Sequence, residues 1–397
     1  GGCGPCRFGM YEAEYRKALR DAGFGNFRVL LFQQTGGMNQ NGKDAALQIN
    51  TQFAQALLQG FMLGDVINDL GYQIRPYEVN QGETDRVIEE AKVALGDALR
   101  EGRAAWRVLR RLKKRFAAIQ VDYTRVKPKV KIIGEFWAQT TEGDGNYKLF
   151  RWLESEGAEV AVEPIGTWIE YLIHIAKQNA EEKLVLDKSK KKLVRKIKLL
   201  QLAFRWWYNL YRWSLGFKTD SLPSQRKLAE YAQAYYNTHL RGGEGHLEVG
   251  KNVMVAKDRH AHMVISLKPF GCMPSTMSDG VQSKVVADYK GAIYIPIETS
   301  GDGEVNVKSR VQMKLFEAKV RAREELAEVL AANNVTLDQV RDYAGKHPGC
   351  TNPMRRLPAH HWAGTAARFV AGVSRRRRMP LRWLGLSRSC SQTQNPY

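Results

Sequence analysis

The sequence predicts an α/β protein with Rossmann-like domains, parallel sheets around a cleft, and long helical segments. Apolar runs at residues 27–32, 130–136 and 263–267 are typical of strands buried on both faces of a parallel sheet. Each run is followed by a loop rich in Gly, Ser or Thr and then by a helical pattern of apolar residues. A hydrophobic content of 44% with 26% charged residues is that of an ordinary globular protein.

We expect an N-terminal α/β part over residues 1–128. Apolar side chains recur at helical spacing from Gly9 to Ala22, just before the first strand. Two longer helices are predicted over residues 44–70 and 84–121. Pro128 marks a boundary because proline interrupts helices and central strands.

A second part over residues 129–240 opens with a βαβ pattern of strand 130–136, helix 146–155 and strand 159–162. Further helical patterns cover residues 168–177, 181–213 and 226–240, and the middle one is a long basic and aromatic insert.

A third part over residues 241–373 contains strand 263–267, a turn that carries Cys272, a short helix and strand 292–297. The loop over residues 298–304 then opens a long helix that ends at Ala332. The periodic pattern stops after Val373, so we expect residues 374–397 to be a disordered or aberrant tail.

Three loops, at residues 33–37, 142–145 and 298–304, directly follow predicted strands, where α/β proteins bind ligands. A glycine-rich turn before a helix can bind an anionic group through its backbone N–H groups. The interpretation of these loops as ordinary tight turns is equally well supported. The candidate substrate-binding residues in these loops are Gln34, Gly36, Gly143, Gly145, Ser300, Gly301 and Gly303.

The 61 Lys and Arg residues exceed the 41 Asp and Glu residues and give a formal net charge of +20. This charge makes nucleic acid or acidic ligands candidate partners. We interpret the basic runs at residues 103–131 and 188–198 as solvated helix faces. No apolar stretch approaches the roughly 20 residues of a membrane span, so no membrane partner is expected. Five cysteines fit a reducing cytoplasm better than a secreted disulfide framework.

Three cysteines occupy chemically suggestive positions. Cys3 and Cys6 stand three residues apart ahead of a helix, and Cys272 lies on a strand-to-helix turn. The positive end of a helix dipole favours thiolate, so we expect a lowered pKa for Cys272. Two close thiols and a distant third suit an iron–sulfur cluster. The motif Cys3-Gly-Pro-Cys6 also occurs in thioredoxin-like thiol–disulfide sites, and a pair of cysteines at this spacing can form half of a zinc site.

Two other motifs receive less weight. Residues 245–251 resemble a phosphate loop, but Asn252 replaces the required Ser or Thr and no strand precedes it, so no ATP site is expected. Trp206 and Trp207 lie among basic residues and could stack nucleic-acid bases. A packing face is the more common meaning of such a stripe, so nucleic acid is the less favoured partner. Cys350 has no evident partner in the sequence.

Three separated strings resemble the 2-hydroxyacyl-CoA dehydratase and benzoyl-CoA reductase superfamily, in particular its activase-related (CoA-activase-associated) branch. They are GCGPCRFGMYEAEYRKAL from Gly2, KPFGCMPS from Lys268 with SDGVQS close behind, and PIETSGDGE from Pro296. The resemblance covers about residues 1–373. Relatives in this branch carry a further cysteine in an upstream Gly-Lys-Glu-x-Cys stretch, absent here, so we expect an N-terminally truncated fragment.

The resemblance implies Rossmann-like domains around a cluster of [4Fe–4S] or double-cubane type, with Cys3, Cys6 and Cys272 as ligands. It further implies a cytoplasmic, anaerobic enzyme, either a dehydratase (lyase) or a reductase component. An ATP-dependent activase would donate low-potential electrons for radical dehydration or reduction of an acyl-CoA or related substrate. The alternatives are a thiol–disulfide oxidoreductase that uses Cys3 and Cys6, and a basic nucleic-acid-binding protein.

Overall fold

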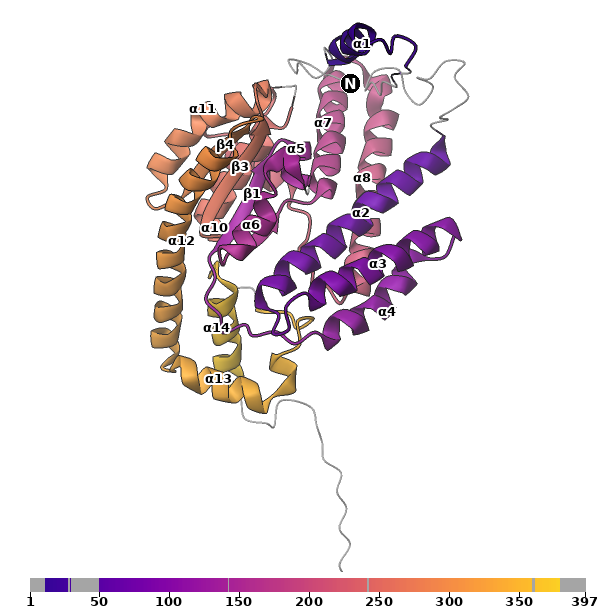
Figure 1. Cartoon of the computed structure of the whole chain (residues 1–397). Coiled ribbons are helices and arrows are strands. Elements are labelled where there is room, and N and C mark those ends of the chain that lie inside the picture. The colour runs from indigo at the N-terminus through magenta and orange to yellow at the C-terminus, as the bar shows by residue number, and fades with distance from the viewer. Residues whose placement is uncertain are drawn as a thin grey trace, which may run out of the picture.

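The computed structural model of the chain describes residues 11–27, 29, 50–141, 143–240, 243–358 and 361–378. Within these residues, a four-stranded sheet has the strand order β2-β1-β3-β4 (Figure 1). The strands are β1 (Lys129–Gly134), β2 (Glu159–Val162), β3 (Met263–Pro269) and β4 (Tyr294–Thr299). All three strand pairs are parallel, so the α/β class predicted from the sequence is confirmed.

The two central strands are buried, although only one of their faces is entirely apolar. The other face carries buried polar side chains such as Ser266 and Lys268 beside Val264. Val130 in β1 aligns with Val160 in β2 on one side and with Met263 in β3 on the other. β3 is buried at every position except its last residue, Pro269. Such continuous burial requires helices on both faces of the sheet.

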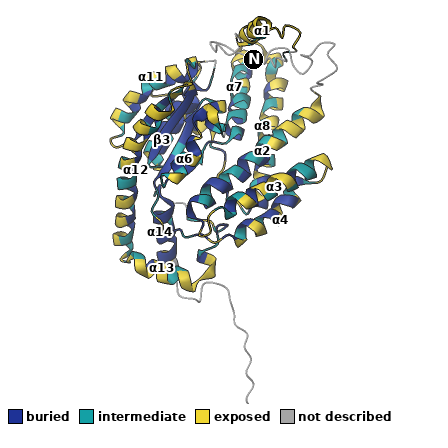
Figure 2. Cartoon of the chain, in the orientation of Figure 1, coloured by how far each residue is buried: buried dark blue, intermediate teal, exposed yellow. Residues whose placement is uncertain are grey.

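Helices α6 (Leu149–Ser155) and α12 (Glu304–Asn333) cover one face. Their apolar side chains, including Leu153 and Val311, share a core with Ile132 and Ile265 of the sheet. On the other face, Val255 of α10 (Gly245–Asp258) packs with Ile133 and Val264. The strands therefore form the middle layer of an α/β/α arrangement, and Figure 2 shows their burial.

A second core is helical and lies beside the sheet. It is formed mainly by α2 (Thr51–Ile74), α3 (Glu83–Arg100), α4 (Ala105–Ala118), α8 (Lys191–Ser214) and α14 (Thr365–Arg378). The remaining α-helices are α1 (Tyr11–Asp21), α5 (Phe136–Thr140), α7 (Ile165–Leu186), α9 (Gln225–Ala232), α11 (Met273–Asp288) and α13 (Leu337–Lys346).

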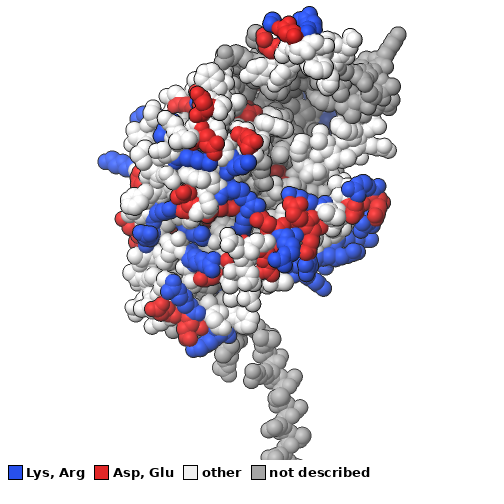
Figure 3. Space-filling view, in the orientation of Figure 1, with Lys and Arg blue, Asp and Glu red and all other residues white. Residues whose placement is uncertain are grey.

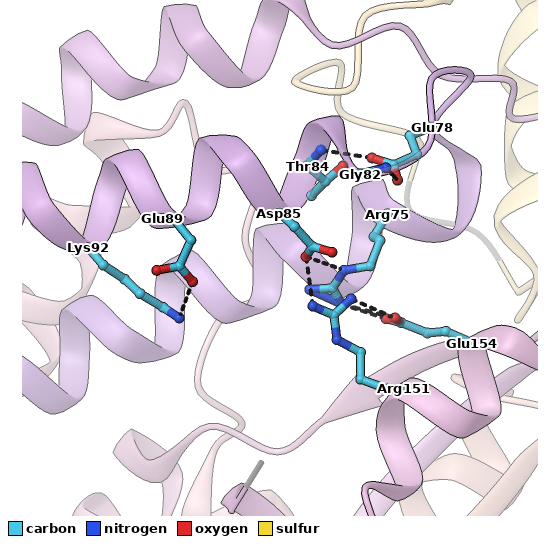
Figure 4. A network of polar contacts seen from close by, with 9 residues as sticks. All are labelled: Arg75, Glu78, Gly82, Thr84, Asp85, Glu89, Lys92, Arg151 and Glu154. Atoms are coloured by element: carbon cyan, nitrogen blue, oxygen red, sulfur yellow. Dashed lines mark hydrogen bonds and ion pairs between the residues drawn. The ribbon is translucent and has the colours of Figure 1, made fainter. Parts of the chain in front are cut away.

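A polar network connects the helical core to the sheet layer. The guanidinium of Arg75 donates to Asp85 at 2.9 Å and to both oxygens of Glu154 on α6, at 2.8 and 3.0 Å. Arg151 donates to the same Asp85 carboxylate at 2.8 Å. Figure 4 shows the two guanidinium groups converging on these two carboxylates. The Arg75 side chain is only 12% exposed, so this contact links α2 to α6 largely out of solvent.

Several predicted helices are shorter or divided. The helix expected over residues 84–121 is two helices, because Gly102 has a positive φ of 66° between α3 and α4. The helix expected over 181–213 is broken at Asp187, whose side chain accepts from Ser189 N and caps a new turn. The helix expected over 226–240 ends at Ala232, and α14 continues through Arg378, beyond the predicted limit of Val373.

The sheet joins two of the predicted parts. β1 and β2 come from residues 129–240, whereas β3 and β4 come from residues 241–373. Most of the strand predicted at residues 27–32 lies outside the described residues, as does the start of the helix predicted at residue 44. None of the described helices combines the length and the apolar character that crossing a membrane requires.

Candidate functional site

The strand order places a topological switch point between β1 and β3. From β1 the chain crosses to β2 on one side, and from β3 it crosses to β4 on the other. The loops that leave the two strands therefore diverge at their carboxyl ends, where open α/β sheets bind ligands. We describe the side chains at this carboxyl edge as the candidate site.

Cys272 stands at this edge, at the N-cap position of α11. The preceding Gly271 has a φ of 70°, which turns the chain sharply after β3, and Pro274 occupies the first turn of the helix. The thiol is half-buried and forms no disulfide. The strand-to-helix turn predicted for this cysteine is thus present.

Cys272 begins a chain of hydrogen bonds that ends at a buried carboxylate. Its thiol donates to the Ser275 hydroxyl, with sulfur and oxygen 3.4 Å apart. Ser275 in turn donates to Oε1 of Glu248 on α10 at 2.7 Å. Ser278 donates to Oε2 of Glu248 at 2.7 Å, so the first turn of α11 is tied to α10.

The acidic surroundings of Cys272 change its ionisation from that expected. Burial raises the pKa of the Cys272 thiol, and the carboxyl groups of Glu248 and Glu135 raise it further. Hydrogen bonding with the side chain and the backbone of Ser275 lowers the pKa but does not compensate. The prediction of a lowered pKa was therefore wrong, because desolvation and nearby negative charge outweigh the position at the start of a helix.

Glu244 and Glu135 extend this acidic group to the loop after β1. The N–H of Phe136 donates to Glu244 Oε1 at 3.2 Å, and Ala138 N donates to Glu135 Oε2 at 2.9 Å. Burial raises the pKa of Glu248 to about 7. Burial and the neighbouring carboxyls Glu248 and Glu135 raise the pKa of Glu244 to about 8. The site therefore contains a carboxylic acid that keeps its proton at neutral pH.

Two of the predicted substrate loops meet at the same edge. The Tyr147 hydroxyl donates to Ser300 O at 2.6 Å, and Ser300 N donates back to that hydroxyl at 2.7 Å. This pair brings the loop of Gly143 and Gly145 against the loop of Ser300, Gly301 and Gly303. The Cys272 turn joins them, because Gly271 N donates to Glu298 Oε1 at 2.8 Å.

The other predicted site residues, Cys3, Cys6, Gln34 and Gly36, lie outside the described residues. Among the residues that the structure does describe, no three His, Cys, Asp or Glu side chains are grouped as a metal site requires. Cys272 fits as one ligand of an iron–sulfur cluster, since its thiol is partly accessible and forms no disulfide. Its carboxyl neighbours favour the protonated thiol until a positive charge binds.

The residues of the candidate site that the sequence did not indicate are Glu244, Glu248 and Ser275. They belong to two segments whose sequence patterns indicate other features, and residues 245–251 form the first two turns of α10. The four-residue spacing of Glu244 and Glu248 is the sequence feature that could have indicated this acidic pair, because it places both side chains near one face of a helix. Lys251 of the same motif is buried beside Glu163, 3.6 Å from its carboxylate.

Comparison of the chain with models of known families, with curated proteins and with solved structures returned no match.

Proposed function

We propose that this chain is an iron–sulfur protein that binds its cluster at the carboxyl edge of the sheet, through Cys272 together with Cys3 and Cys6. The observation that carries the proposal is the position of Cys272 at the switch point, partly accessible and beside two substrate loops. α1, which begins five residues after Cys6, lies at the end of the molecule to which the carboxyl ends of the strands point (Figure 1).

The residues around Cys272 have roles that suit such a site. The hydrogen-bond chain through Ser275 to Glu248 gives the thiol proton a route away from sulfur when a metal binds. The cluster, when bound, supplies one-electron chemistry. Glu244 holds a proton at neutral pH because its pKa is about 8, so it is suited to protonate a departing hydroxyl group.

We propose an acyl thioester such as an acyl-CoA, or a related compound, as the substrate class. Two aromatic side chains support an organic substrate at this edge: Trp137, 68% exposed, follows β1, and Phe270, 73% exposed, follows β3. The loops of Gly143 and Ser300 are the proposed contacts for its polar groups. Low-potential electrons would come from an ATP-dependent activase, in the reducing cytoplasm that thiol ligands require.

The first test is the metal content of the full chain purified without oxygen. We expect brown protein with about four iron atoms and as many sulfides per chain for a [4Fe–4S] cluster, or about eight for a double cubane. The visible absorbance should bleach when an activase of this superfamily is added with ATP. A folded but colourless and iron-free chain would contradict the proposal.

A further inference from the structure

The hairpin formed by α7 and α8 carries an exposed apolar surface at its tip and along one side. Val185 and Leu186 at the tip are 85% and 90% exposed. On α8, Leu199, Leu202 and Trp206 are each 66–67% exposed. We call these five side chains the hairpin surface. Large aliphatic side chains this exposed, gathered on one element, mark an interaction site.

The geometry of α8 explains why its outer side remains uncovered. Val194, Phe204, Tyr208 and Tyr211 occupy its inner side and are buried. Leu199, Leu202 and Trp206 are spaced by three and four residues, so they share a face, which is opposite that of Tyr208. α8 therefore has two apolar faces, and the described chain covers only one of them.

The same face becomes basic toward the tip. Seven of the eleven residues from Lys188 to Lys198 are Lys or Arg. Lys192, Arg195 and Lys196 are exposed and continue the row of Leu199 at helical spacing. The whole of α8 contains no Asp or Glu. Of the nearby acidic residues, Glu181 pairs with Lys198 at 3.0 Å and Asp187 with Lys190 at 3.6 Å.

From this combination we propose that the hairpin surface binds an anionic lipid bilayer, lying on it rather than crossing it. Aliphatic side chains and Trp enter the boundary between headgroups and acyl chains, and flanking lysines contact lipid phosphates. This contact is independent of the cluster, and it requires no helix that crosses the membrane. The hairpin is visible as the antiparallel pair α7 and α8 in Figure 1.

Other occupants match the surface less well. Nucleic acid would satisfy the lysines but would set Val185, Leu186 and Leu199 against a charged backbone. A second copy of the chain would bring two basic hairpins together, which like-charge repulsion opposes. A bilayer with acidic lipids satisfies the apolar and the basic side chains at once.

The test is flotation of the full chain with vesicles of phosphatidylcholine alone and of phosphatidylcholine with about one-third phosphatidylserine. We expect binding only to the mixed vesicles. The double variant Leu186→Ser, Trp206→Ser should bind about tenfold more weakly, which corresponds to about 1.4 kcal/mol, because two apolar side chains no longer enter the lipid. Replacement of Lys191 and Lys192 by Gln should also weaken binding.

Matched controls come from other helices. Phe316 on α12 is 68% exposed, and Phe316→Ser should leave vesicle binding unchanged. Arg111→Gln with Lys114→Gln on α4 removes the same charge as the lysine pair and should likewise have little effect. The proposal is overturned if mixed vesicles are not bound, or if the hairpin and control variants bind equally. A dimer that the hairpin variants dissociate, with no vesicle binding, would assign this surface to a second copy instead.

Discussion

Two buried glutamates at opposite ends of the sheet show how differently this protein treats the same side chain. Glu159, at the start of β2, and Glu248, beside the carboxyl end of β3, are 2% and 1% exposed. Glu159 lies 3.1 Å from the ammonium of Lys129 and accepts from Tyr77 at 2.8 Å and Thr365 at 2.6 Å. Within the described part of the chain, the hydrogen bonds that Glu248 accepts come from the neutral hydroxyls of Ser266, Ser275 and Ser278.

The difference in partners reverses the effect on ionisation. Burial raises the pKa of Glu159, but Lys129 and the hydrogen bonds outweigh it, and the net pKa is lowered. Burial raises the pKa of Glu248 to about 7, because the hydrogen bonds from Ser275 and Ser278 and the charge of Lys251 offset the effect of burial only in part. A compensated buried charge is typical of structural support, whereas uncompensated titratable groups cluster at functional sites. The comparison therefore separates a structural end of the sheet from the end that we propose to be functional.

The largest expected effect is a break in the sheet at the functional end. Gly134 ends β1 with a φ of 128°, and a Cβ there would lie 2.0 Å from the carbonyl oxygen of Leu267 in β3. Gly134→Ala must separate the two strands, so we expect a loss of about 4 kcal/mol or more in the free energy of unfolding. Urea unfolding measures it. Gly301→Ala, with nothing within 4 Å of its Cβ, is the control and should be nearly neutral.

At the structural end, Glu159→Gln should lower the free energy of unfolding by about 3 kcal/mol, because Lys129 would remain buried without its closest carboxylate. The exposed Glu328→Gln is the matched control and should change stability little. Because the folded pKa of Glu159 is lowered, its contribution is present above about pH 4.5 and is lost as the pH falls below it. Equal melting temperatures for the two variants at pH 7 would refute the structural role of Glu159.

Glu244 at the functional end should show the opposite pH dependence. Its folded pKa of about 8 is above the unfolded value, so its contribution to stability is present below about pH 4.5 and is lost as the pH rises to about 8. Relative to the wild type, Glu244→Gln should therefore gain melting temperature between pH 5 and pH 8.5. A difference between the two proteins that does not vary with pH would show that Glu244 is not protonated in the folded chain.

The sequence predicted the four strands of the described sheet and the turn at Cys272 well, because these depend on local patterns: mainly apolar runs, and Gly and Pro at a sharp bend. It did not predict the contact between Ser275 and Glu248, which are 27 residues apart and meet only when α10 packs against α11. The raised pKa of Cys272 was missed for the same reason, since its main cause, burial, and the approach of the Glu248 and Glu135 carboxyl groups both arise only when separate segments pack together.

The central claim is that Cys272 binds metal at the carboxyl edge of the sheet. The most direct measurement compares iron and acid-labile sulfide per chain in Cys272→Ala and Cys350→Ala, both purified without oxygen and both checked for fold by circular dichroism. Cys350 is buried at the end of the short turn that follows α13, and its sulfur accepts from Arg355 at 2.9 Å. α13 lies at the end of the molecule opposite α1 (Figure 1), and Figure 3 shows acidic and basic side chains on the surface there. We predict that Cys272→Ala loses most of the iron and that Cys350→Ala keeps it. Equal iron in the two variants would contradict the assignment of Cys272 as a ligand.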